Sequence, residues 1–247
     1  MARFYWKRSP EELNDISGLE IGDKGVVVTD DGIIQFYKRD TTTWIPVGFA
    51  SMPENDIGTP GGVGFGVGIC PPYLLPSGFA PLPGCYTRGH ANYGNYQYLD
   101  GSIMCWIPKF YYKIGTGSNG LSVNVVDIKG GTSFANTAAA NDAGYALHRA
   151  FIDGGVEQPG FMVDKYMCSK NAKGTGFVAS SIKGGNPIST ASTHNPIAEL
   201  SSVSTGNIYA SAIQAAKGRS GANGAYDATS IFHCASRFQY AALALLS

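Results

Sequence analysis

Two Asp-Gly turns constrain the fold of this chain more than any other feature of its sequence. One lies at residues 31–32, between the valines of 26–28 and the apolar and aromatic run at 33–37, and the other lies at residues 100–101. An Asp-Gly pair readily takes the positive φ angles of a tight hairpin turn, so each pair predicts two antiparallel strands. We therefore expect a β-rich fold of the α+β class.

The first hairpin is part of a larger unit. A turn at residues 38–42 leads into a further strand at 44–47, which completes a three-stranded meander within residues 21–47. Three strands bury too little apolar surface to be stable alone. We therefore expect the meander to pack against a neighbour or against copies of itself, so that the protein is a homo-oligomer.

The first 20 residues contain the signals of a helix start. Ser9 can cap a helix, Pro10 fits its first position, and two glutamates follow in the first turn. Because few apolar side chains accompany these signals, we interpret the segment as a docking arm.

The composition of the chain changes after the meander and indicates two parts. We expect residues 1–48 to form an N-terminal arm and meander for attachment, and residues 49–247 to form the body. The body begins with a connecting segment, residues 49–85, that is rich in Gly and Pro. Its glycines at 61–68 are followed by Cys-Pro-Pro and not by a helix start, so they do not fit a phosphate-binding loop. They favour a segment packed closely against another backbone.

A low content of charge excludes several classes of protein. Charged residues make up 15% of the chain, and 18 Lys and Arg balance 18 Asp and Glu. The apolar content of 44% is too high for a disordered tail. A zero net charge lacks the basic footprint of a nucleic-acid binder. No stretch of about 18 apolar residues is present, so we expect no membrane insertion.

The N-terminus and the cysteines indicate a reducing compartment. Residues 1–10 lack the apolar core of a secretory signal, so we expect assembly in the cytoplasm. The cysteine count is odd and no Cys-x-x-Cys pair occurs, which predicts reduced thiols. The four histidines show no metal-ligand spacing, so we expect no metal and no cofactor. The five cysteines are Cys70, Cys85, Cys105, Cys168 and Cys234.

The second half of the chain predicts one strand, one loop and two helices. Residues 160–168 fit a strand with Phe161 and Val163 facing inward and Tyr166 as a further inward candidate, and the polar residues 169–204 fit a long surface loop. Asn207 can cap a helix over 208–217.

A stripe of apolar residues predicts the last helix, over residues 231–246, with Phe238 as its main buried side chain. Ser236 as the cap, with a helix that begins only at Arg237, is an alternative that the local sequence also allows. The stripe comprises Ile231, Ala235, Phe238, Ala242 and Leu245.

Tyrosines gather within residues 86–112, among Gly and Asn. Tyr offers a large rigid contact area with a polar tip, which suits a recognition surface, and the same residues suit packing between subunits. Both interpretations stay open. The candidate binding residues are Tyr93, Tyr96, Tyr98, Tyr111 and Tyr112.

Three carboxylates raise a catalytic alternative. Asp153, Glu157 and Asp164 could supply the pair of carboxyl groups that a glycosidase needs. Asp153 precedes Gly-Gly, however, and fits a turn residue, whereas Asp164 adjoins Lys165 and fits an ion pair. We therefore expect no enzyme activity.

Two parts of the sequence resemble proteins of phage tails. Residues 22–48 resemble the small β-meanders of tail-fibre and tail-tip proteins, where a Gly-Asp, a strand, a turn, an aromatic strand and a Trp-containing strand follow one another. Residues 65–114 and 144–247 are similar to phage tail proteins with a C-type-lectin-like domain of the sulfatase-modifying-factor kind. In that family the pattern Phe-x-x-Asp-Lys-Tyr precedes a variable loop and a helix, and Cys-x-x-Arg-Phe leads into a second helix. The matching residues are Phe161, Asp164, Lys165, Tyr166, Cys234, Arg237 and Phe238.

The resemblance implies a structural virion protein of a tailed phage. Its N-terminal part would join other tail proteins, its lectin-like body would contact a glycan or protein of the host surface, and fibres suggest a homotrimer. In the family, the ligand surface and any catalytic cysteines follow the second helix. This chain ends before that half, so no catalytic residue is carried over, and we expect the natural polypeptide to continue past Ser247. A glycan-degrading tail enzyme and a purely structural tail or collar component remain as alternatives.

Overall fold

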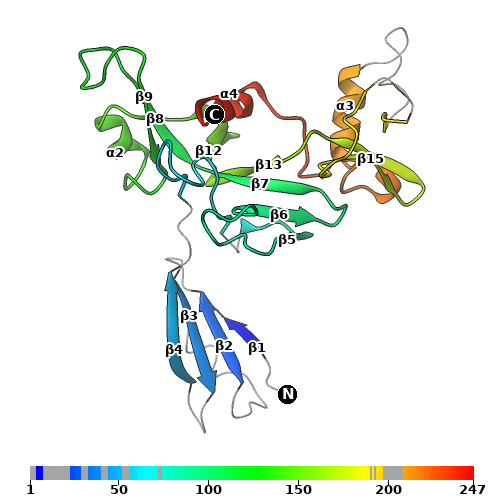
Figure 1. Cartoon of the computed structure of the whole chain (residues 1–247), viewed down its shortest axis with the longest axis horizontal. Helices are drawn as coiled ribbons and strands as arrows, with labels where there is room; N and C mark the ends of the chain where they lie inside the picture. The colour runs from blue at the N-terminus through cyan, green and yellow to red at the C-terminus, as the bar shows by residue number, and fades with distance from the viewer. Residues whose placement is uncertain are drawn as a thin grey trace. The chain divides into compact units, whose positions relative to one another are not determined.

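The computed structural model of the chain is β-rich, with several small antiparallel sheets and short helices, and belongs to the α+β class as expected (Figure 1). It divides into two compact units, Met1–Glu54 and Asn55–Ser247. The boundary expected after residue 48 falls inside strand β4 (Trp44–Ser51), so the N-terminal unit extends further than the sequence indicated. The residues described by the structure are 4–7, 23–28, 33–39, 44–51, 56–71, 74–189, 191, 193–196 and 208–247.

The N-terminal unit is a four-stranded sheet in the order β1-β2-β3-β4. Strands β2 (Lys24–Val28), β3 (Ile33–Arg39) and β4 form the expected antiparallel meander. Strand β1 (Phe4–Lys7) lies parallel to β2, which the sequence analysis did not predict. The side chain of Val27 is fully buried. The helix expected after Ser9 and the turn at 31–32 lie outside the described residues.

The central sheet of the body has the order β13-β7-β6-β5, with every pair antiparallel. The second Asp-Gly turn joins β6 to β7, and Gly101 takes a φ of 84° there, which confirms the hairpin. The four strands are β5 (Phe79–Pro81), β6 (Asn95–Tyr98), β7 (Ile103–Pro108) and β13 (Gly160–Asp164).

Both faces of this sheet are covered. Phe161 and Val163 of β13 face one core, as expected, whereas Met162 faces a second core built around Tyr96 and Trp106. This alternation follows the two-residue period of a strand. The glycine-rich segment also packs closely on the sheet, because the Gly68 N–H donates to the carbonyl oxygen of Trp106 at 3.1 Å. The expectation of a tightly packed backbone is therefore confirmed.

A second sheet, in the order β10-β8-β9, extends from the first core. Phe110 of β8 and Phe151 are fully buried in that core, with ring centroids 5.3 Å apart. Helix α2 (Thr137–Asp142) is capped by Asn136. The other elements are β8 (Phe110–Ile114), β9 (Val126–Gly130), β10 (Ala146–Leu147), the 3₁₀ turn η2 (Arg149–Phe151) and the hairpin of β11 (Ile152–Asp153) and β12 (Val156–Glu157).

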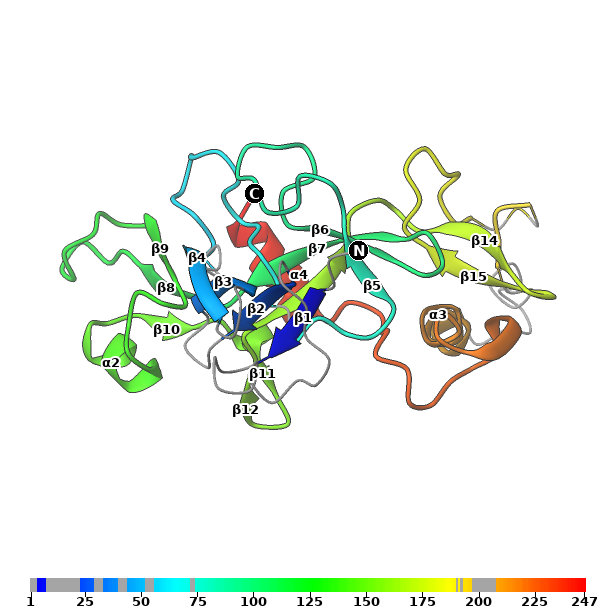
Figure 2. The same ribbon diagram turned by 90° about the horizontal axis from the view of Figure 1, so that it is seen from below.

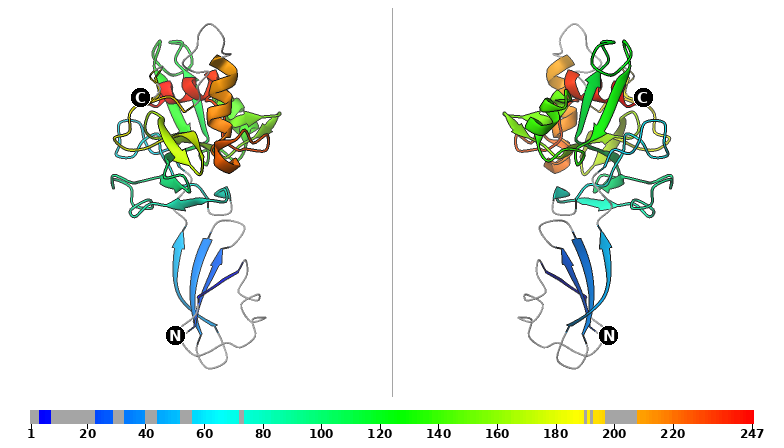
Figure 3. Two further views of the ribbon diagram at one scale, coloured as in Figure 1. Left: turned by 90° about the vertical axis from the view of Figure 1, so that its right-hand side faces the viewer. Right: turned by 90° about the vertical axis from the view of Figure 1, so that its left-hand side faces the viewer.

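A peripheral module replaces part of the expected loop at 169–204. Strands β14 (Ser169–Lys173) and β15 (Gly176–Ser180) form a hairpin there, so the loop interpretation is wrong for these residues. The loop was expected because residues 169–204 are polar overall and β14 has a polar sequence, although β15 contains the buried residues Val178 and Ala179. Helix α3 (Ile208–Lys217) lies beside β15, as Figures 2 and 3 show, and the 3₁₀ turn η4 (Ala222–Gly224) completes the module. Helix α3 matches its expected range, whereas its expected cap, Asn207, lies outside the described residues.

The last helix, α4, is Arg237–Leu245 and follows the shorter alternative. The Ser236 side chain accepts from the Gln239 N–H while Gln239 accepts from the Ser236 N–H, and this capping box fixes the helix start. The expected stripe is therefore wrong in its first half. Ile231 is 55% exposed and Phe238 is 37% exposed. The helix packs on the first core through Ala242, Leu243, Leu245 and Leu246 instead.

None of the helices within the described ranges combines the length and the apolar character that a membrane span requires.

Candidate functional site

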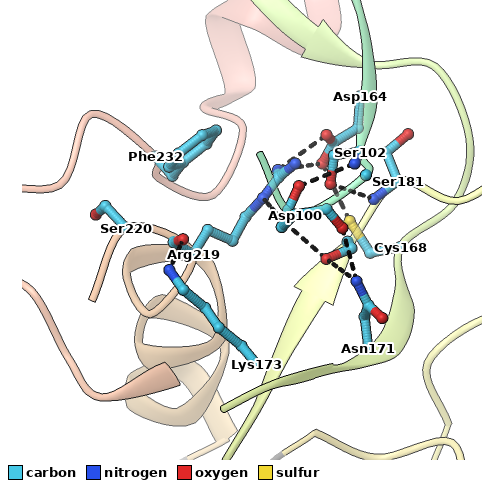
Figure 4. A network of polar contacts seen from close by, with 12 residues as sticks. Asp100, Ser102, Asp164, Cys168, Asn171, Lys173, Ser181, Arg219, Ser220 and Phe232 are labelled. Carbon is cyan, nitrogen blue, oxygen red and sulfur yellow. Dashed lines mark hydrogen bonds and ion pairs between the residues drawn. The ribbon is translucent and has the colours of Figure 1, made fainter. Parts of the chain in front are cut away.

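An extended polar cluster of the body is centred on Arg219, just past the end of α3. The Arg219 side chain is 4% exposed, and its guanidinium group points toward two carboxylates of the central sheet (Figure 4). Nη1 donates to both oxygens of Asp164, at 2.9 and 3.1 Å, and Nε donates to Oδ2 of Asp100 at 3.3 Å. We call this cluster the Arg219 hub.

The carboxylates of the hub also accept hydrogen bonds from neighbouring segments. Oδ1 of Asp100 accepts from the Ser102 N–H at 2.9 Å, and Oδ2 accepts from the Ser180 hydroxyl at 2.8 Å. Asp164 accepts from the Cys168 thiol at 3.0 Å. Such multiple donors offset the cost of removing these charges from water.

The hub extends on the other side to the C-terminal segment of the body. The guanidinium carbon of Arg219 lies 4.3 Å from the centroid of the Phe232 ring, which is a close cation–π contact. Phe232 also packs edge-on against Tyr98 of β6, with centroids 4.7 Å apart. The Arg219 carbonyl oxygen accepts from Lys173 Nζ of β14. The hub therefore joins the central sheet, the peripheral module and the segment that leads to α4.

The chemistry of the hub favours a structural role. Both carboxylates bind the Arg219 guanidinium group, so neither is without a partner. Burial, with a further contribution from the Asp164 charge, raises the pKa of the Cys168 thiol to about 12. Cys168 is therefore a protonated thiol at neutral pH and no nucleophile. The arrangement holds the peripheral module in place on the sheet.

The structure does not bring the five candidate tyrosines onto one surface. Tyr96 and Tyr111 are fully buried and Tyr93 is 8% exposed. The Tyr96 hydroxyl accepts from the Cys70 N–H at 2.9 Å, and burial raises its pKa well above the usual range. The Tyr111 hydroxyl lies 3.2 Å from the Thr137 hydroxyl.

These three tyrosines are internal packing residues, so the expectation that they contact a receptor is corrected. Tyr98 and Tyr112 are half-buried and belong to different sheets. Tyr98 stacks on Phe79, with centroids 5.0 Å apart, and Tyr112 lies 5.5 Å from the His148 ring.

The residues of the first family motif connect β13 and the residues just after it to neighbouring segments. Phe161 packs in the first core and Asp164 belongs to the hub. Lys165 Nζ donates to the Ala91 carbonyl oxygen at 3.0 Å, and the Tyr166 N–H donates to the Ser181 hydroxyl oxygen at 2.9 Å. The expected ion pair between Asp164 and its neighbour Lys165 is therefore replaced by the pair with Arg219.

The residues of the second motif are all exposed. Cys234 precedes α4, and Arg237 and Phe238 open the helix with the guanidinium carbon 4.8 Å from the ring centroid. Unlike the first motif, this one places side chains where a ligand can reach them.

The carboxylates of the glycosidase alternative have separate partners. Glu157 accepts from the Thr137 hydroxyl at 2.5 Å and from Lys109 Nζ at 3.3 Å, and these contacts lower its pKa. Asp153 is exposed at the end of β11, where it pairs with Val156 and directly precedes a turn in which Gly154 and Gly155 both take positive φ. The expected turn therefore forms, with Asp153 as the strand residue before it. Within the described part of the chain, no three His, Cys, Asp or Glu residues lie together in a way that could hold a metal ion.

Sequence reasoning missed Arg219 as the centre of the hub. Its partners lie 55 and 119 residues away along the chain, so no local pattern connects them. One feature of the sequence could have indicated Arg219: it is a single Arg in a segment rich in Gly and Ser, in a chain that has few charged residues.

Comparisons of this chain with protein-family models, with curated proteins and with solved structures found no match.

The thiols are expected to react with an alkylating reagent in two groups. Cys234 is exposed, whereas Cys70 and Cys85 are buried and burial raises the pKa of Cys70 to about 12. Mass spectrometry of the native protein should show one fast modification, and unfolding without reductant should allow five. Cys234→Ser should remove the fast step and is the matched control. A mass that shows fewer than five reactive thiols after unfolding would contradict the expected reducing compartment.

Proposed function

We propose that the protein is a structural component of a phage tail, a tail fibre or tail tip, that attaches the virion to the host surface. In this proposal it has no enzymatic activity, it functions in the virion after assembly in the host cytoplasm, and its body is a lectin-like domain. The N-terminal unit contacts other tail proteins and copies of itself, most simply as a homotrimer. The body contacts a glycan or protein of the host.

The division of the chain is the observation that carries this proposal. Residues 22–48, which resemble tail-fibre meanders, lie wholly within the N-terminal unit, and both lectin-like segments lie within the body. The proposal therefore assigns attachment and recognition to separate folding units. A phage tail protein needs this separation, because one end must join the tail while the other contacts the host.

The packing of the body adds support. The Arg219 hub and the two apolar cores hold the sheets together, so the strands that carry the exposed side chains keep fixed positions. Fixed positions reduce the entropy lost on binding and are typical of recognition surfaces. Such a body suits a receptor-binding protein as well as the purely structural alternative, so the two must be separated by experiment.

Adsorption to cells tests the proposal directly. The fluorescently labelled full-length protein is incubated with a panel of bacterial strains, and binding is measured by flow cytometry. We expect saturable binding to a subset of strains and protection of those strains from the tailed phages that infect them. The same protein after thermal unfolding is the control.

Two other results would contradict the proposal. Failure to bind any strain would favour a purely structural tail component. Release of reducing sugar ends from the bound cells would favour the glycan-degrading alternative.

A further inference from the structure

Two arginines share one aromatic ring at the start of α4. The guanidinium carbon of Arg237 lies 4.8 Å from the centroid of the Phe238 ring, and that of Arg149 in η2 lies 5.9 Å from it. All three side chains are exposed, and Phe238 retains 37% of its accessible surface. We call this group the Arg149–Phe238–Arg237 cluster.

Neither arginine of the cluster has a carboxylate partner within the part of the chain that the structure describes. The body contains four arginines. Arg219 binds Asp100 and Asp164, and Arg88 lies 3.9 Å from Asp56. For Arg149 and Arg237, no carboxylate oxygen among the described residues lies within 4 Å, and each contacts the Phe238 ring instead.

Two unpaired like charges beside one ring repel each other, and the repulsion is relieved when an anion binds between them. The ring face attracts both guanidinium groups and restricts their positions. A guanidinium group presents its N–H donors in a planar fork that matches a carboxylate or a phosphate. The cluster therefore places two guanidinium carbons 4.8 and 5.9 Å from one ring centroid, without a carboxylate partner among the described residues, on a chain with no net charge.

The exposed ring of the cluster restricts the class of ligand. Phe238 keeps 37% of its surface exposed beside the two guanidinium groups, so the cluster combines an apolar ring with charged donors. A sugar with an acidic group has both complementary parts, since its C–H face packs on rings and its anion binds the forks. A bare inorganic anion would use the charge alone.

We propose that the Arg149–Phe238–Arg237 cluster binds an anionic saccharide through its carboxylate or phosphate group. This inference rests on the proposed function, because it names the chemical class of the host-surface ligand. In this arrangement Arg149 and Arg237 contact the anion, and Phe238 positions the two guanidinium groups.

Calorimetric titration of the full-length protein with two saccharides tests the inference. Trigalacturonic acid supplies carboxylates, and an oligomer of glycerol phosphate supplies phosphates. The methyl ester of trigalacturonic acid is the neutral control. We expect binding to at least one anionic probe and at least tenfold weaker binding to the methyl ester. Tighter binding of one probe shows whether the cluster prefers a carboxylate or a phosphate group on the saccharide. No binding to either probe would overturn the inference.

Variants then assign the binding to the cluster. The double variant Arg149→Ala/Arg237→Ala should weaken binding at least tenfold, and Arg149→Lys/Arg237→Lys should recover only part of it because the planar fork is lost. Lys183→Ala removes one exposed positive charge elsewhere and should bind like the original protein. Equal binding by the double alanine variant and the original protein would overturn the inference.

The adsorption assay separates this inference from the proposed function. If the original protein and the double alanine variant bind cells equally well, the receptor site lies elsewhere on the body and only the inference fails. If the original protein binds no strain but binds trigalacturonic acid through the cluster, the proposed function fails and the saccharide site stands.

Discussion

Replacement of Arg219 by Ala is expected to lower the free energy of unfolding of the body by about 3–5 kcal/mol. The change would leave the carboxylate of Asp100, whose side chain is 4% exposed, without its positive partner, and would remove both hydrogen bonds to Asp164. A buried charge without a partner is among the most destabilising features a single substitution can create. The contact with the Phe232 ring would be lost as well.

Urea denaturation measures this effect if the body is observed separately from the N-terminal unit. The chain has three tryptophans, of which only Trp106 lies in the body. In a background with Trp6→Phe and Trp44→Phe, the fluorescence of Trp106 reports the unfolding of the body. Arg219→Lys, which keeps the charge but not the fork, should be intermediate.

Arg237→Ala is the matched control for the Arg219 experiment. It removes the same side chain from an exposed position and should change the free energy of unfolding by less than about 1 kcal/mol. If Arg219→Ala were no more destabilising than Arg237→Ala, the hub would not hold the peripheral module on the sheet.

The parts of the fold that the sequence predicted are those set by local chemistry. The hairpin of β6 and β7 forms where Asp100-Gly101 favours the required backbone angles, and strands β2 and β3 pair on either side of the other Asp-Gly as expected. Helix α4 begins at Arg237 because Ser236 and Gln239 form a capping box. The hairpin of β14 and β15 was missed because β14 is polar and the short apolar run of β15 lacks the alternation that marks a half-buried strand.

The candidate site was less predictable because burial depends on contacts between distant segments. Tyr96 and Tyr98 are two residues apart on the same strand, yet one is fully buried and the other is half-buried against Phe232. Arg149 and Phe238 meet only because η2 and α4 pack together. No pattern within either segment indicates these neighbours.

Replacement of Phe151 by Ala is the second large expected effect, a loss of about 3–5 kcal/mol in the free energy of unfolding. Phe151 is fully buried, and its ring lies 5.3 Å from Phe110 and 5.4 Å from Phe161 between centroids. The variant loses the transfer free energy of the ring and leaves a cavity that close-packed neighbours cannot fill.

Phe238→Ala is the matched comparison for Phe151→Ala, because it removes the same ring atoms from a partly exposed position. The sequence alone predicted Phe238 as the main buried residue of its helix, but its side chain is 37% exposed and its ring contacts two guanidinium groups. We expect a loss of only about 1 kcal/mol, from partial burial and weak cation–π contacts. Urea denaturation of both variants, with Trp106 fluorescence as the signal, decides the matter. Equal losses, or a larger loss for Phe238→Ala, would mean that α4 docks through Phe238 and that the ring is not free to position Arg149 and Arg237 for a ligand.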